Sequence, residues 1–258
     1  MLAPRATTPS YTGPVAPPLV LLHPFPLDPA AWDEVAAPLA GACEVHVPAL
    51  PGLGGAPRHP HPSIDAYADV VAAGVAALPG GRAVVGGVSM GGYVALSLAA
   101  RRPELVAGLA LVDTKAEADD ERAREGRRAG IATIATEGPG PFLDALLPRL
   151  VAPGAPADVT ERVRAIAERQ EPGGLADALL AMRDRPDRSA DLAAMDVPAL
   201  VAVGELDAVT PPAIARALAA ALPDARLEIV AGAGHLVPVE APAAIVPALR
   251  DLLARAGG

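Results

Sequence analysis

Short apolar runs alternate along the chain with longer segments in which apolar residues recur at helical spacing. The runs are of strand length, and six are predicted as strands: residues 19–23, 43–50, 83–89, 106–114, 198–207 and 225–233. Most of them are apolar at consecutive rather than alternate positions, so both faces of the sheet need to be covered. The pattern predicts an α/β fold, a mostly parallel sheet with helices on both faces.

The segments between the runs predict helices with recognisable ends. Asp28 and Ser63 stand at expected N-cap positions, and Gly41 follows the end of the first helix. The predicted helices are residues 28–41, 63–78, 91–102, 211–222 and 241–256. Residues 1–17 are polar and rich in proline and predict a loose or edge segment. Right-handed crossovers place the functional loops of such a sheet at the carboxyl ends of its strands.

Residues 115–196 interrupt the alternation. They contain no strand-like run, and residues 160–170 and 175–185 have apolar positions at helical spacing. This segment also holds 28 of the 51 charged residues, 12 basic and 16 acidic, which indicates a largely solvated surface. We expect residues 1–114 and 197–258 to form the core and residues 115–196 to form an inserted helical cap over the strand ends. A solvated helical layer without a capping role is the alternative.

Composition and charge indicate which binding partners and cell compartments the protein is expected to have. The 258 residues carry 21 Lys and Arg against 30 Asp and Glu, a net charge of −9, which disfavours nucleic acids and anionic membranes as partners. We find no uncharged apolar run of membrane-spanning length and no secretory signal pattern. A single cysteine, Cys43, cannot form an internal disulfide. We expect a cytoplasmic protein.

One serine lies in the pattern Gly-x-Ser-x-Gly, as Gly87-Val88-Ser89-Met90-Gly91. The pattern is weak alone, but here it joins a predicted strand to a predicted helix. A turn this sharp strains the serine backbone and needs small neighbours where two backbones pass closely. It also places the Met90 amide at a helix start, where developing negative charge is stabilised. The alternative is a glycine-rich turn in which Ser89 only caps the helix.

A serine hydroxyl needs a general base to act as a nucleophile. His235 follows the last predicted strand on a glycine-containing loop, and it is the favoured base. The other histidines end a strand, lie within one or occupy a proline-rich loop: His23, His46, His59 and His61.

The imidazole in turn needs a carboxylate to fix its tautomer. Asp207 follows the strand at 198–207 and completes the chain order Ser…Asp…His. Asp113, which ends the strand at 106–114, and Glu205 remain alternatives.

The loop after the first strand offers a second oxyanion donor. Pro24 and Pro26 have no N–H, so the Phe25 amide between them is the available donor. Aromatic residues that could line a substrate pocket are Phe25, Trp32, Tyr93 and Phe142, although Trp32 and Tyr93 could equally be core residues. Arginines in residues 122–128 are candidates for binding an anionic substrate, with pairing to neighbouring acids as the favoured alternative.

Four ordered motifs, LLHPFPLDPAAWDEV, GGVSMGGYVALSLA, VGELDAVTPP and GAGHLVPVEAP, make the chain resemble the α/β-hydrolase superfamily. Within it, the chain is similar to the small enol-lactonase, esterase and cofactor-free haloperoxidase group. The resemblance implies Ser89 as nucleophile, Asp207 as acid, His235 as base, and the Phe25 and Met90 amides as oxyanion hole. It also implies residues 115–196 as the cap.

This chain departs from the group at several positions. It has His23-Pro24 where the group usually has His-Gly, and the short stretch before the first strand leaves room for few of the family's opening strands. The resemblance further implies a cis peptide bond between Phe25 and Pro26.

These features together predict a serine hydrolase that acts on a small carboxylic ester or lactone through an acyl-enzyme. Neither a metal nor a cofactor is expected, because the histidines lack the spacing of metal ligands. The alternatives are carbon–carbon bond hydrolysis or perhydrolysis with the same triad, and a small-molecule receptor with little turnover.

Overall fold

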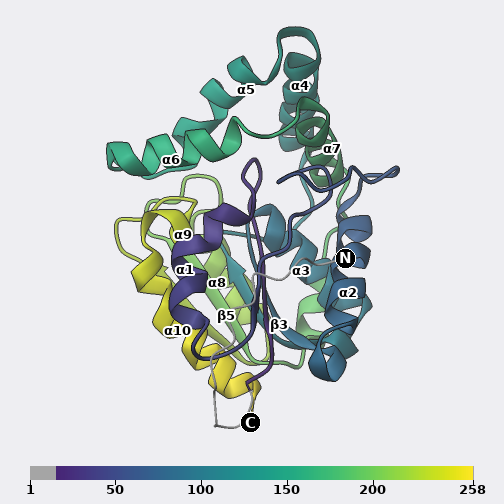
Figure 1. The fold of residues 1–258 in the computed structure, drawn as a ribbon, viewed down its shortest axis with the longest axis vertical. Helices are drawn as coiled ribbons and strands as arrows, with labels where there is room; N and C mark the ends of the chain where they lie inside the picture. Colours follow the sequence, from purple (N-terminus) through teal and green to yellow (C-terminus); the bar gives the residue numbers. More distant parts are fainter. Residues whose placement is uncertain (1–15, 258) are drawn as a thin grey trace.

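Six parallel strands form one sheet with the order β2-β1-β3-β4-β5-β6. The computed structural model describes residues 16–257 (Figure 1). The strands are β1 (Leu19–Leu22), β2 (Val45–His46), β3 (Ala83–Val88), β4 (Val106–Val112), β5 (Ala199–Gly204) and β6 (Ala225–Val230). The predicted α/β class and the six strands are confirmed. The expectations for residues 1–15 and for opening strands before β1 lie outside the described residues.

The two edge strands differ from the sequence prediction. The strand predicted over 43–50 shortens to Val45–His46, because Pro48 has no N–H and the Leu50 amide donates to the His23 ring at 2.9 Å rather than to a strand. At the other edge, β6 alternates exposed and half-buried positions, so it is not covered on both faces as the central strands are. It ends at Val230, just before a turn at Gly232.

Helices cover both faces of the sheet, as predicted, and successive residues of β1 divide between them. Leu19 and Leu21 pack in a cluster with α1 (Asp33–Leu39), α9 (Val237–Glu240) and α10 (Pro242–Ala256). Val20 and Leu22 pack in a second cluster with α2 (Ile64–Ala76), α3 (Met90–Arg101) and α8 (Pro212–Ala221). The alternation follows from the two-residue period of a strand.

The predicted helix caps are present. The Asp28 side chain accepts a hydrogen bond from the Ala30 amide at 2.9 Å, and Ser63 accepts one from the Ala66 amide at 3.0 Å. The helix predicted over 28–41 is a 3-10 turn, Pro29–Trp32, followed by α1.

Residues between β4 and β5 form four α-helices: α4 (Glu121–Glu137), α5 (Pro139–Leu146), α6 (Ala157–Ala167) and α7 (Pro172–Arg183). In Figure 1 they lie above one end of the sheet. This segment bonds to the loops that follow β1, β2 and β6, through Arg169 to Asp28, Asp177 to Arg58 and Leu150 to His235. The sequence pattern located α6 and α7 but neither α4 nor α5. Helix α4 buries only Gly130 and Ile134 and so has almost no apolar stripe. Among the described helices, none is long and apolar enough to cross a membrane.

Candidate active site

Ser89 occupies a strained turn between β3 and α3, with φ 51° and ψ −113°. A Cβ atom on Gly87 would lie 2.1 Å from the Gly91 carbonyl carbon, and one on Gly91 would lie 2.2 Å from the Leu22 oxygen. Both positions therefore require glycine. The Thr114 hydroxyl donates to the Ser89 carbonyl at 2.9 Å and holds the turn against the end of β4.

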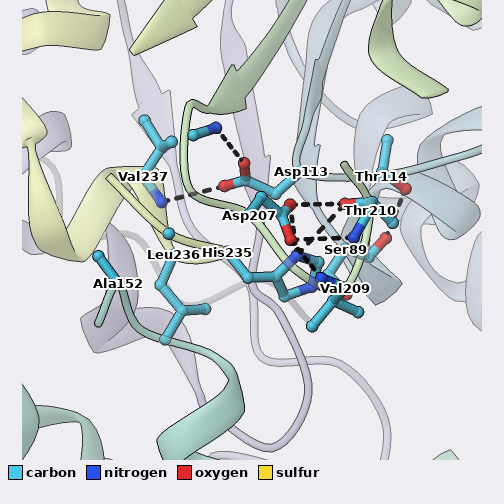
Figure 2. A network of polar contacts seen from close by, with 12 residues as sticks. Ser89, Asp113, Thr114, Ala152, Asp207, Val209, Thr210, His235, Leu236 and Val237 are labelled. Atoms are coloured by element: carbon cyan, nitrogen blue, oxygen red, sulfur yellow. Dashed lines mark hydrogen bonds and ion pairs between the residues drawn. The ribbon is translucent and has the colours of Figure 1, made fainter. Parts of the chain in front are cut away.

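A hydrogen-bond chain links three side chains from separate loops (Figure 2). Ser89 Oγ lies 2.9 Å from His235 Nε2, and His235 Nδ1 lies 2.8 Å from Asp207 Oδ2. All three residues are buried at the carboxyl ends of β3, β5 and β6. The structure thus brings together the residues predicted as nucleophile, acid and base.

Asp207 is held as a carboxylate by several donors. Its Oδ1 accepts from the amides of Val209 and Thr210 at 2.7 and 2.9 Å, and its Oδ2 accepts from the Thr210 hydroxyl at 2.7 Å. Burial alone would raise the pKa of Asp207, but the hydrogen bonds and charge of His235, with the Thr210 donors, hold it below its usual value. An ionised Asp207 requires the proton on His235 Nδ1, which leaves Nε2 free to accept the Ser89 proton.

The two alternative acids are engaged elsewhere. Asp113, buried at the end of β4, accepts from the amides of Gly204 and Val237 at 2.9 and 3.0 Å, and burial raises its pKa to about 7. Glu205 accepts from the Gly232 amide at 3.0 Å and is exposed. Within residues 16–257, neither carboxylate bonds to the His235 ring.

Of the two amides predicted as an oxyanion hole, Met90 follows Ser89 at the start of α3, and Phe25 lies on the loop after β1. Within residues 16–257, neither the Phe25 nor the Met90 N–H donates to another protein group. The Phe25–Pro26 peptide bond is cis, as predicted. Two residues before Phe25, the His23 ring accepts a hydrogen bond from the Leu50 amide at Nε2 and contacts the Pro24 oxygen at Nδ1. Burial lowers the pKa of His23 to about 4, so the ring is a neutral support for the loop rather than a base.

The residues predicted to line a pocket differ in burial and in their neighbours. Trp32 is fully buried with its indole N–H bonded to the Leu22 oxygen at 3.0 Å, so the core alternative applies and the tentative substrate contact is withdrawn. Tyr93 is buried beneath the Arg185 guanidinium, 4.1 Å from its ring centre. Phe142 of α5 is half-buried, and its ring centre lies 6.0 Å from that of Phe25. This contact joins residues 115–196, called the insert below, to the loop after β1 that carries Phe25, called the oxyanion loop below.

Two arginines of α4 have acidic partners. Arg127 bonds to Asp119, and Arg128 bonds to Glu121 and Glu125. For Arg127 and Arg128 these ion pairs favour the alternative, pairing with neighbouring acids, over a site for an anionic substrate.

Sequence reasoning gave no role to two residues beside the site, Thr210 and Glu240. Thr210 precedes the Pro-Pro start of α8 in the motif that contains Asp207. Glu240 closes α9 in the motif that contains His235, and its carboxylate accepts from the amides on either side of that histidine. The only indication of a role in the sequence is that each residue lies in the same motif as a member of the proposed triad.

Known proteins resemble this chain in sequence and in fold. A family model described as "Alpha/beta hydrolase family" matches residues 19–248. The chain is 36% identical over 236 residues to a pimeloyl-[acyl-carrier protein] methyl ester esterase of Aromatoleum aromaticum, covering 85% of this chain and 91% of that protein.

Solved structures are similar over nearly the whole chain. A malate-bound thermophilic esterase from Thermogutta terrifontis has a TM-score of 0.90 and 35% identity, covering 95% of this chain and 92% of its own. An enol-lactonase from Burkholderia xenovorans has a TM-score of 0.83 and 28% identity, covering 93% and 92%. The predicted enzyme class, hydrolases of ester bonds, is confirmed by these named relatives. On the family match and the extent of these similarities, the chain belongs to the alpha/beta hydrolase family.

Proposed function

We propose that this protein is a serine hydrolase that cleaves a small carboxylic ester through an acyl-enzyme. Ser89 is the nucleophile, His235 the general base and Asp207 the acid that orients it. The observation that carries the proposal is the hydrogen-bond chain from Ser89 Oγ through the imidazole to Asp207 Oδ2, with contacts of 2.9 and 2.8 Å.

The reaction follows from where the protons lie. His235 Nε2 takes the Ser89 proton as Oγ attacks the ester carbonyl, and Asp207 stabilises the imidazolium that forms. The tetrahedral oxyanion accepts hydrogen bonds from the Phe25 and Met90 amides, and the Met90 amide lies at the start of α3. His235 then protonates the departing alcohol. Water attacks the acyl-enzyme by the same route and regenerates the serine.

The substrate class is proposed from the relatives. The 36% identical relative is named for a methyl ester, which favours an ester of a small alcohol. The thermophilic neighbour is named an esterase. A lactone is the second candidate, because the Burkholderia neighbour is an enol-lactonase. Both share the carbonyl that Ser89 would attack. We propose residues 115–196 as the cap over this site, with Phe142 beside the acyl chain.

An activity panel tests the proposal. Purified protein is assayed on p-nitrophenyl esters of increasing acyl length, on monomethyl esters of dicarboxylic acids, and on lactones. We expect turnover of at least one ester series and a loss on the order of 10⁶-fold in kcat for Ser89→Ala.

Two results would contradict the proposal. One is turnover that persists in Ser89→Ala. The other is tight binding of these compounds by the wild-type protein with no turnover, which would favour the receptor alternative.

A further inference from the structure

The loop that carries His235 is held by a carboxylate that plays no part in the proposed proton transfers. Glu240 Oε2 accepts from the Gly234 amide and Oε1 from the Leu236 amide, both at 3.0 Å. These two amides lie on either side of His235. The carboxylate therefore fixes the backbone from which the imidazole projects, on a loop that its glycines would otherwise leave flexible.

The same carboxylate also binds the insert. Glu240 Oε2 accepts from the amide of Ala152, which lies between α5 and α6, at 2.7 Å. The His235 amide donates in turn to the Leu150 carbonyl at 3.0 Å. A Cβ atom on Gly234 would lie only 2.4 Å from the Ala152 nitrogen, so the two backbones are in direct contact. Figure 2 draws Ala152 beside Leu236 and His235.

A further bond joins the insert to the helix that bears Glu240. Arg162 of α6 donates to the carbonyl of Val239 in α9 at 2.7 Å. The loop that carries the general base His235, called the base loop below, is thus held by the insert on one side. On the core side, Asp113 holds it through the Val237 amide at 3.0 Å.

We propose that Glu240 is a positioning residue through which residues 150–152 of the insert fix His235 against Ser89. The inference rests on the proposed function. It makes this part of the insert a component of the catalytic scaffold as well as a cover for the substrate. A displacement of about 1 Å at a catalytic group can cost on the order of 100-fold in rate, so a small shift of this loop has a large effect.

Glu240→Gln is the test variant, because it preserves shape while replacing one acceptor oxygen with an NH₂ group that faces N–H donors. Glu205→Gln is the matched control, since Glu205 also accepts from an amide of this region, Gly232, but contacts neither neighbour of His235. Ser63→Ala, which removes the cap of α2 on the opposite face of the sheet, controls for a general loss of stability.

For Glu240→Gln we expect kcat to fall about 10- to 100-fold with KM nearly unchanged. We also expect faster hydrogen–deuterium exchange in peptides spanning 150–155 and 232–237 together. Glu205→Gln and Ser63→Ala should retain the wild-type kcat. Glu240→Asp retains the charge with a shorter reach, and we expect it to lose less activity than the glutamine variant. It also serves as the test if that variant does not fold.

The inference is overturned if the folded Glu240→Gln variant keeps the wild-type kcat. It is also overturned if Ser63→Ala, at the same melting temperature, loses as much kcat as Glu240→Gln. A third contrary result is faster hydrogen–deuterium exchange in the base loop but not at 150–155. An inactive wild-type protein would instead refute the proposed function, and the exchange measurement would still test the link between Glu240 and the insert.

Discussion

At the scale of single residues, Thr210 illustrates how one hydroxyl can support two members of the proposed triad. Its Oγ1 lies 2.7 Å from Asp207 Oδ2 and 3.3 Å from His235 Nδ1. Thr210→Val keeps the shape of the side chain but removes this donor. We expect kcat on the best ester to fall about 5- to 10-fold, the value of one hydrogen bond of about 1 kcal/mol.

Thr210→Ser is the matched control, since it keeps the hydroxyl and should retain most of the activity. Equal rates in the wild-type, valine and serine proteins would show that the backbone amides alone position Asp207.

His23 predicts a pH dependence of stability. Its folded pKa of about 4 lies below the ordinary value of 6.5, so the unfolded chain binds the proton more readily. The contribution of the neutral His23 ring to the free energy of unfolding is therefore fully present above about pH 6.5. It is lost as the pH falls towards 4, by up to about 3 kcal/mol. His23→Gln can still accept from the Leu50 amide but does not titrate. Urea unfolding at about pH 7 and about pH 4.5 should show wild type losing more stability than the variant. Parallel losses would contradict the assignment.

At the scale of elements, the turn from β3 to α3 packs against the end of β1. Gly91→Ala would place a methyl group 2.2 Å from the Leu22 oxygen, at the start of the loop that carries Phe25. Because the clash is with backbone, we expect a shift of the oxyanion loop, a kcat loss of 100-fold or more, on the order of the cost of a misplaced group, and a lower melting temperature.

Gly126→Ala is the contrasting variant for this prediction. A Cβ atom at Gly126, within α4, meets nothing within 4 Å, and alanine stabilises a helix interior by up to about 1 kcal/mol. We expect an equal or higher melting temperature and unchanged activity. A full-rate Gly91→Ala enzyme would refute the proposed packing of the turn.

At the scale of the whole molecule, polar contacts join the insert to itself and to the core, and some of these contacts are buried. Asp119, just before α4, bonds to Arg185, just after α7, at 2.6 Å, and both side chains are 2% exposed. Arg169 and Gln170 bond to Asp28 on the loop after β1. These contacts close the two ends of the insert together and tie it to the strand ends.

Asp119→Ala should therefore be strongly destabilising. It leaves the buried Arg185 charge without its carboxylate, and losses of about 3–5 kcal/mol are typical of such changes. Urea unfolding measures the effect, and Glu121→Ala, which breaks an exposed pair with Arg128, should cost less than about 1 kcal/mol. Similar losses in the two variants would contradict a structural role for the buried pair.

Most of the strands and several helix starts were predictable because they depend on the residues within each segment. Consecutive apolar residues mark the central strands, and caps such as Ser63 mark helix starts. The edge strand β2 was predicted too long because hydrophobicity cannot reveal that the Leu50 amide is taken by the His23 ring. Helix α4 gave little periodic signal because most of its surface faces solvent.

The sequence by itself determined the strand–helix alternation, the glycines around Ser89 and the order of the candidate side chains, because these depend on backbone sterics and short-range periodicity. Only the tertiary structure decided that Asp207 rather than Asp113 contacts His235, that Trp32 belongs to the core, and that Glu240 joins the insert to the base loop. These outcomes depend on distances between loops that follow different strands. Such distances are set by the order of the sheet and by the docking of the insert, which no local pattern encodes.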